Sequence, residues 1–138
     1  VDWNIGNFSV TDDLQLFSRW DYDWFRVSSR IMDFYFFSRV VSEAGDQTIF
    51  SYNIDVLMQD RFIMYLKAYH DRNPLSEREI LFLKECYRFF LLNYVVKYGT
   101  YFFHEIFATR LQKETLEVHL PSIEKKFNPS ILLKALNL

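Results

Sequence analysis

Apolar residues change their spacing once along this chain, near Ser28, and that change sets the fold class. Before it, residues 8–10 and 14–20 have the character of two short β-strands. Residues 11–13, Thr-Asp-Asp, separate them, and their short polar side chains favour a turn. The second segment alternates with a period of two, which is typical of a strand with two unlike faces. The sequence therefore predicts one β-hairpin near the N-terminus.

From Ser28 onward the spacing is helical. Ser76 followed by Glu79 predicts a capping box at a helix start. Gly99 is a candidate kink or interruption of the helix that follows, and Pro121 predicts a bend or break. We expect helices over about 28–44, 54–70, 76–107 and 109–127, and a short last helix after 128–130. The predicted fold class is mainly α, with one small hairpin carried by a helical body.

Composition narrows the classes of function. The chain has 138 residues, half of them hydrophobic, which is enough for one domain with its own core over 1–138. A net charge of -2 gives no overall positive field, so nucleic acid is not an expected partner. Charged or polar residues interrupt every apolar run, so no membrane partner is expected either. The lone Cys86 cannot form an internal disulfide, which favours a reducing, cytoplasmic location.

Acidic and amide side chains stand at both ends of the predicted hairpin. Asp2 and Asn7 form D-x-x-x-x-N before the first strand, and Asp21 and Asp23 follow the second. A hairpin brings its outer ends together, so Asp2, Asn7 and Asp21 are expected to converge. Phosphoryl transfer needs a carboxylate that orients the attacking hydroxyl and hard oxygen ligands that hold Mg²⁺. These residue types therefore indicate phosphoryl-transfer chemistry.

Three motifs in order resemble a known family. They are the segments 1–7 (VDWNIGN), 20–24 (WDYDW) and 30–34 (RIMDF), with Asp33 twelve positions after Asp21. This pattern is similar to the C-terminal lobe of the aminoglycoside phosphotransferase, choline kinase and homoserine kinase family, whose fold resembles that of protein kinases. The family motif is H-x-D-x-x-x-x-N, a hydrophobic-D-[FWY]-[DE] element, and a second Asp that opens a helix.

The resemblance implies a role for each motif residue. Asp2 is the catalytic base or orients the hydroxyl, and Asn7 and Asp21 are the Mg²⁺ ligands. Asp23 supports the metal site or faces the substrate, and Asp33 braces the catalytic loop. The implied enzyme is a kinase that transfers the terminal phosphoryl group of ATP or GTP to a hydroxyl of a small molecule, such as an aminoglycoside, an amino alcohol or a homoserine-like acceptor.

The resemblance also divides the chain. Residues 1–25 correspond to the catalytic loop and metal-binding hairpin, and 26–138 to the helical body. The family's nucleotide-gripping N-terminal lobe, with its glycine-rich loop and strand lysine, has no counterpart in these 138 residues. The family's histidine two positions before Asp2 would precede Val1. We therefore expect this chain to be inactive by itself and to need an N-terminal lobe as partner.

Other readings of the sequence remain open. One is a catalytically inactive kinase-like scaffold, although a scaffold needs none of Asp2, Asn7 and Asp21. Another is a helical interaction domain in which these side chains point apart. The acceptor cannot be named, and the candidates for its contacts are Asp23, Trp24, Arg26 and Tyr98. Four aromatic residues cluster just before residue 26: Trp20, Tyr22, Trp24 and Phe25. Such a cluster is typical of core packing or nucleotide contacts, and a choline site is the alternative.

Overall fold

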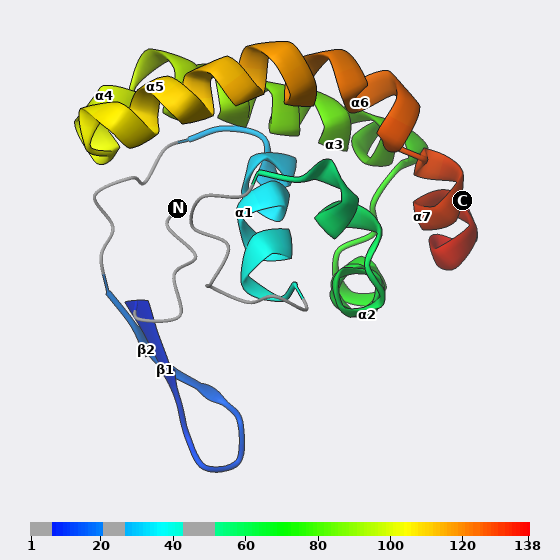
Figure 1. Ribbon diagram of the computed structural model, residues 1–138. Coiled ribbons are helices and arrows are strands. Elements are labelled where there is room, and N and C mark those ends of the chain that lie inside the picture. Colours follow the sequence, from blue (N-terminus) through cyan, green and yellow to red (C-terminus); the bar gives the residue numbers. More distant parts are fainter. Residues whose placement is uncertain (1–6, 21–26, 43–51) are drawn as a thin grey trace.

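The computed structural model describes residues 7–20, 27–42 and 52–138, and it is mainly helical with one two-stranded hairpin (Figure 1). The hairpin is β1 (Phe8–Val10) and β2 (Leu16–Arg19). The body begins with η2 (Arg30–Asp33), α1 (Phe34–Val40), η4 (Ile54–Met58), α2 (Asp60–Arg72) and α3 (Glu77–Phe90). It continues with η5 (Leu91–Lys97), α4 (Gly99–Phe102), α5 (Glu105–Glu114), η6 (Thr115–His119), α6 (Leu120–Lys126) and α7 (Pro129–Leu136). The prediction of a mainly α chain with a small hairpin is confirmed. In the described ranges, no helix has both the length and the apolar content needed to cross a membrane.

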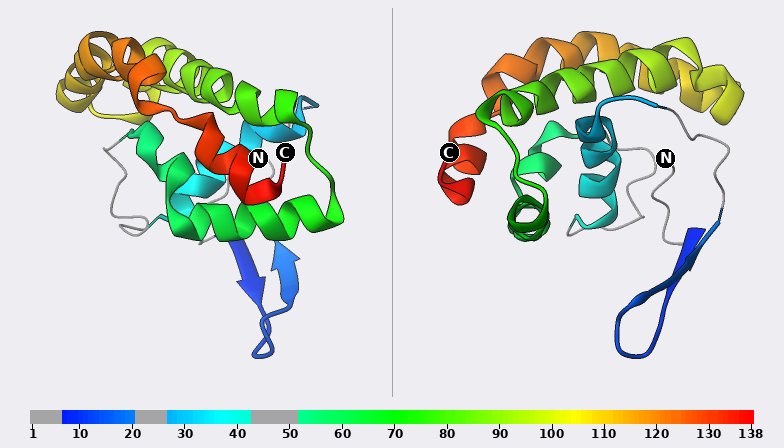
Figure 2. Two further views of the ribbon diagram at one scale, coloured as in Figure 1. Left: turned by 90° about the vertical axis from the view of Figure 1, so that its right-hand side faces the viewer. Right: turned by 180° about the vertical axis from the view of Figure 1, so that it is seen from behind.

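The hairpin is antiparallel, with Phe8 opposite Arg19 and a register irregularity between Ser9 and Val10. Its second strand begins at Leu16, two residues later than the sequence predicts, because Leu14 has a left-handed φ of 64° that belongs to the turn. The turn closes through Thr11, whose N–H donates to the carbonyl of Gln15 at 2.8 Å. In all three views the hairpin projects away from the helices (Figures 1 and 2).

The helices form two layers (Figures 1 and 2). In one layer α3 runs beside the α5–α6 arm, and below it lie α1 and α2, with α7 at the far end. One hydrophobic cluster joins both layers and extends from Ile31 to Leu136. Burying a large apolar side chain contributes about 1.5–3 kcal/mol, so this cluster is the main source of stability.

Aromatic rings of α1 form the centre of the core. Tyr35 is fully buried and meets the ring of Tyr87 edge-on at 4.7 Å and that of Phe90 at 5.0 Å. The guanidinium of Arg39 lies over the ring of Tyr52 at 4.8 Å. The Tyr87 hydroxyl donates to the backbone carbonyl of Tyr52 at 2.8 Å. The aromatic content of the sequence is therefore used largely in packing.

The predicted start of α3 is confirmed, and its predicted end is wrong. Ser76 and Glu79 form the capping box. The helix expected to about residue 107 instead changes to the π-helix η5 after Phe90. It is interrupted at Tyr98, directly before Gly99, where the sequence predicts a kink or interruption, and again at Phe103, whose backbone is extended. The chain reverses there so that the apolar side of α5 packs back on the same layer. Residues 101–103 are Tyr-Phe-Phe, so polar turn residues do not mark the reversal.

Two further predicted helices are each divided. The expected helix over 54–70 is η4 followed by α2, because Gln59 between them has extended backbone with ψ 147°. The expected helix over 109–127 contains the π-helix η6, which ends at His119, two positions before Pro121. Proline has no N–H and its ring would clash with the carbonyl four residues earlier, so the backbone widens there. The first helix begins at Arg30, capped by Ser29, and the predicted break at residues 45 and 46 lies outside the described residues.

A bidentate ion pair joins the start of the helical body to the start of α3. Arg30 Nε lies 2.7 Å from Glu79 Oε1 and Arg30 Nη2 lies 2.9 Å from Glu79 Oε2. Arg30 Nη2 also donates to the carbonyl of Pro74 at 2.8 Å. Hydrogen bonds from Arg30 and from the backbone of Ser76 lower the pKa of Glu79 to about 2.

This pKa shift predicts a specific acid sensitivity. Because the folded pKa of Glu79 lies below its ordinary value of 4.5, the stabilisation is complete above pH 4.5 and is lost as the pH falls toward about 2. We expect Glu79→Gln to lower the free energy of unfolding by about 1 kcal/mol at neutral pH, which is the upper limit for a partly exposed ion pair. Near pH 2 the same substitution should lower it by almost nothing. Urea unfolding at both pH values measures this. Glu77→Gln is the matched control, since Glu77 makes no ion pair with any described residue, and an equal loss in both variants would contradict the assignment.

The two central tyrosines give a matched pair of hydroxyl deletions. Tyr87→Phe leaves the buried carbonyl of Tyr52 without its donor and should lower the free energy of unfolding by about 1–2 kcal/mol. The Tyr35 hydroxyl is buried and has no hydrogen-bond partner in the described part of the chain, so Tyr35→Phe should be neutral or stabilising. Urea denaturation of both variants tests this, and the opposite order would show that the assigned donor is wrong.

Candidate functional site

The base of the hairpin is the described part of the motif region. The backbone N–H of Trp20 donates to the carbonyl of Asn7 at 2.9 Å, one position beyond the pair of Phe8 and Arg19. In an antiparallel pair the partner of Phe8 is Arg19, so the next pair outward is Asn7 with Trp20. The strand register therefore continues by one residue pair. Asn7 is half-buried and Trp20 is exposed. The hairpin thus brings the end of D-x-x-x-x-N beside the residue that precedes Asp21 in the sequence.

The other predicted site residues divide between described and undescribed segments. Asp2, Asp21 and Asp23 lie outside the described residues, as do Trp24 and Arg26. Asp33 is half-buried at the junction of η2 and α1, and it forms no side-chain cap on α1. Within the described ranges no group of three His, Cys, Asp or Glu side chains could hold a metal ion. Since only Asn7 of the predicted Mg²⁺ ligands falls in those ranges, the predicted metal site stays a prediction.

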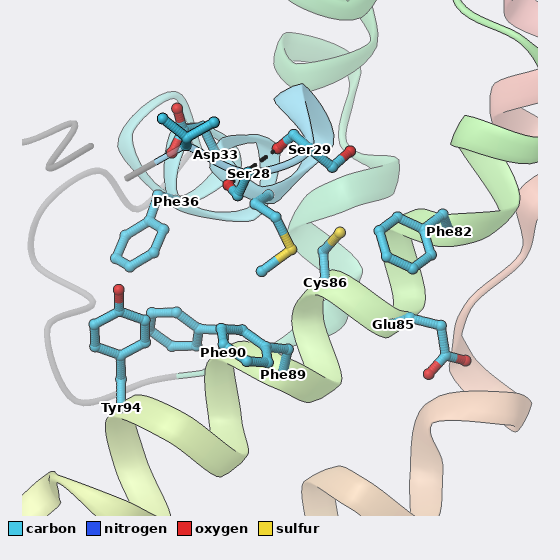
Figure 3. Close-up of a pocket in the computed structure, with 12 residues that line it drawn as sticks. Ser28, Ser29, Asp33, Phe36, Phe82, Glu85, Cys86, Phe89, Phe90 and Tyr94 are labelled. Atoms are coloured by element: carbon cyan, nitrogen blue, oxygen red, sulfur yellow. Dashed lines mark hydrogen bonds between the residues drawn. The ribbon is translucent and has the colours of Figure 1, made fainter. Parts of the chain in front are cut away.

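A cavity of about 600 Å³ opens between the start of the body and α3 (Figure 3). Residues 28–36 form one wall, and α3 with the first turn of η5 forms the other. Five aromatic rings line it: Phe36, Phe82, Phe89, Phe90 and Tyr94. Its size lies within the usual range for small-molecule sites, about 300–1,000 Å³.

Three of these rings make a rigid corner at one end of the cavity. The ring of Phe36 meets that of Phe90 edge-on at 4.7 Å and that of Tyr94 edge-on at 5.4 Å. Phe90 and Tyr94 stack at 5.2 Å. Because each ring is held by the other two, this corner is formed before any ligand arrives. The rings of Phe82 and Phe89 are more exposed, 43% and 46%.

Polar groups are few in the cavity and stand at its edges. Figure 3 shows Asp33 on the side of Phe36, and Glu85 at the opposite edge beyond Phe82. Glu85 Oε2 accepts a hydrogen bond from Arg88 Nη1 at 2.5 Å. Ser28 and Ser29 supply two hydroxyls, and that of Ser29 already accepts the N–H of Ile31. The cavity is therefore apolar in its middle and acidic at its ends.

Cys86 lies on the α3 wall, and its thiol is held neutral. Burial, followed by the nearby charge of Glu85, raises the pKa of Cys86 to about 12. A neutral thiol is a poor nucleophile, so Cys86 acts here as a small apolar wall residue.

The α3 wall is the part of the site that sequence reasoning missed. The signal was present, because α3 has more apolar residues than one buried face requires. Ile80, Leu83 and Tyr87 face the core, while Phe82, Cys86 and Phe89 follow a second helical stripe. The predicted acceptor contact Tyr98 is instead outside the cavity lining, with the ammonium of Lys97 over its ring at 4.6 Å.

The thiol gives a direct test of this wall. Near pH 8 a pKa of about 12 leaves far less thiolate than the usual value of about 8.5, so native Cys86 should react with Ellman's reagent at least about 100-fold more slowly than the chain unfolded in guanidinium chloride. Absorbance kinetics under both conditions measure the ratio. Similar rates in the two states would show that the α3 wall is open at Cys86.

A comparison with known protein families, with curated proteins and with solved structures finds no match for this chain. The resemblance to phosphotransferases therefore rests on the motifs of the sequence. The structure adds two described features for a functional proposal, the paired base of the hairpin and the aromatic cavity.

Proposed function

We propose that this chain is the helical C-terminal lobe of a Mg²⁺-dependent phosphotransferase of the aminoglycoside phosphotransferase and choline or homoserine kinase type. The reaction transfers the terminal phosphoryl group of ATP or GTP to a hydroxyl of a small molecule. The observation that carries the proposal is the hydrogen bond of 2.9 Å between Trp20 N–H and the Asn7 carbonyl. It holds Asn7 beside Trp20, the residue that directly precedes Asp21 in the sequence, and this pairing supports a site shared by the two proposed metal ligands.

The donor set fits the metal. An amide oxygen from Asn7 and a carboxylate from Asp21 are hard ligands, and Mg²⁺ usually takes only one or two such ligands from protein. When bound, Mg²⁺ neutralises charge on the phosphates. Asp2 accepts the proton of the acceptor hydroxyl as its oxygen bonds to phosphorus and the nucleoside diphosphate leaves. In this proposal Asp23 supports the metal site or faces the acceptor, and Asp33 braces the catalytic loop from η2.

Exposed apolar side chains on both faces of the hairpin and in its turn support a further lobe. Leu14, Leu16 and Phe17 are 81%, 68% and 74% exposed, which is unusual for three apolar residues on one small hairpin. A nucleotide-gripping N-terminal lobe that packs here would cover them. In this proposal that lobe supplies the glycine-rich loop and the strand lysine that hold the nucleotide phosphates.

A metal titration tests the proposed site in this chain. Mn²⁺ replaces Mg²⁺ as a paramagnetic probe, and it should broaden the amide signals of Asn7 and Trp20 selectively in NMR spectra. Asp21→Asn removes the charge of one proposed ligand, and Asn7→Ala removes the amide oxygen of the other. Each should weaken Mn²⁺ binding at least about tenfold. Asp12→Asn is the matched control, because Asp12 lies in the turn at the other end of the hairpin.

Turnover tests the reaction itself. When the chain is joined to an N-terminal lobe, Asp2→Asn should lower kcat at least about 100-fold, measured by release of nucleoside diphosphate. Mn²⁺ binding that Asp21→Asn leaves unchanged would contradict the metal site. If Mn²⁺ binds as expected but no hydroxyl acceptor is phosphorylated, the result would favour the alternative hypothesis, a catalytically inactive kinase-like scaffold.

A further inference from the structure

We infer that the aromatic cavity binds a hydrophobic amine, a ligand with one cationic nitrogen and an aryl or branched alkyl body. This inference rests on the proposed function only where it identifies that ligand with the acceptor, which would then be a hydrophobic amino alcohol. Binding by the cavity itself is a separate property of the described residues.

The walls select an apolar body. Phe82 and Phe89 are half-exposed on the α3 side of the cavity (Figure 3), and Met32 of η2 lines the other wall. These surfaces gain free energy when an apolar group removes them from water. At about 600 Å³ the cavity has room for a ring with a short side chain.

The charges select a cation over an anion. Asp33 and Glu85 both line the cavity, and no Lys, Arg or His side chain is among its described lining residues. The Asp33 end also holds the corner of Phe36 and Tyr94, whose rings lie 5.4 Å apart. Glu85 is already paired with Arg88, so the assignment uses the carboxylate of Asp33. Aromatic faces and a carboxylate together attract an ammonium group and disfavour an anion. The amine is therefore assigned to the Asp33 end.

The small number of polar groups argues against a polyhydroxylated ligand. Besides the two carboxylates, the lining offers the hydroxyls of Ser28, Ser29 and Tyr94. Ser29 already accepts the N–H of Ile31. An aminoglycoside or a sugar has many donors and acceptors, and each one left unpaired in an apolar cavity reduces affinity. Among the acceptor classes that the sequence leaves open, the cavity thus favours an amino alcohol with a large apolar group.

A set of four small probes separates charge from apolar body. Phenylalaninol has both, phenylpropanol lacks the charge, phenylpropanoate reverses it, and ethanolamine lacks the ring. Calorimetry or NMR titration of the full chain without nucleotide should give phenylalaninol the highest affinity, at least about fivefold above each of the other three. Equal or tighter binding of ethanolamine or phenylpropanoate would overturn the inference, and so would no detectable binding of phenylalaninol.

Matched variants locate the binding. Phe89→Ala removes a wall ring and should weaken phenylalaninol binding at least about fivefold. Phe107→Ala is the control, since Phe107 is exposed to a similar extent, 42% against 46%, and lies outside the cavity lining. Asp33→Asn should weaken phenylalaninol and leave phenylpropanol unchanged, which a merely structural role of Asp33 would not do. Unchanged binding in Phe89→Ala would overturn the assignment.

The two proposals fail separately. If phenylalaninol binds as expected and no alcohol is phosphorylated, the cavity stands and the phosphotransferase proposal falls. If the chain joined to an N-terminal lobe phosphorylates an acceptor and Phe89→Ala changes neither KM nor kcat, the cavity is not the acceptor site. The identification of the amine with the acceptor then falls, while binding of the amine by the cavity is decided by the titrations above.

Discussion

The contact of Arg30 with Glu79 and with the carbonyl of Pro74 sets the geometry on which the rest of the described site depends. It joins residues 49 positions apart and fixes the start of the body against the first turn of α3. An ion pair this exposed contributes little free energy, about 1 kcal/mol or less. The burial of Ile31 and the ring contacts of Tyr35 provide the stability. The guanidinium of Arg30 sets how η2 is aligned along the first turn of α3. Both walls of the cavity follow from that alignment, since one extends from Ser28 to Phe36 and the other lies on α3 beyond Glu79.

The aromatic residues serve two different purposes on the two stripes of α3. Rings that face inward, such as Tyr87, are buried and pack edge-on against α1. Rings on the neighbouring stripe, such as Phe82 and Phe89, keep about half of their surface exposed and line the cavity. Phe90 belongs to both sets, because it contacts Tyr35 in the core and forms the corner of the cavity with Phe36 and Tyr94. A ligand in the cavity would therefore rest on rings that the core already holds in place.

The hairpin and the cavity, the two parts of the candidate site, are stabilised by different interactions. The hairpin is held by backbone hydrogen bonds, and its apolar side chains near the turn are open to solvent. The cavity stands on the hydrophobic cluster and is fixed by side-chain packing. In the proposed enzyme this separation is useful, since the hairpin positions metal ligands through the backbone while α1 and α3 shape the acceptor site.

The sequence by itself determined the local features of this protein. It gave the hairpin near residues 8–19, the capping box at Ser76, and the helical character of the rest, because hydrogen bonds and periodicity within a few residues decide these. It also placed Asn7 directly before the first strand and Trp20 at the end of the second, and the structure then paired the two. Only the tertiary structure decided where the long helix ends and turns back, since the reversal near Phe103 depends on the packing of α5 rather than on turn residues. The cavity likewise required the tertiary structure, because Asp33 and Phe89 meet across it only when α1 and α3 pack together.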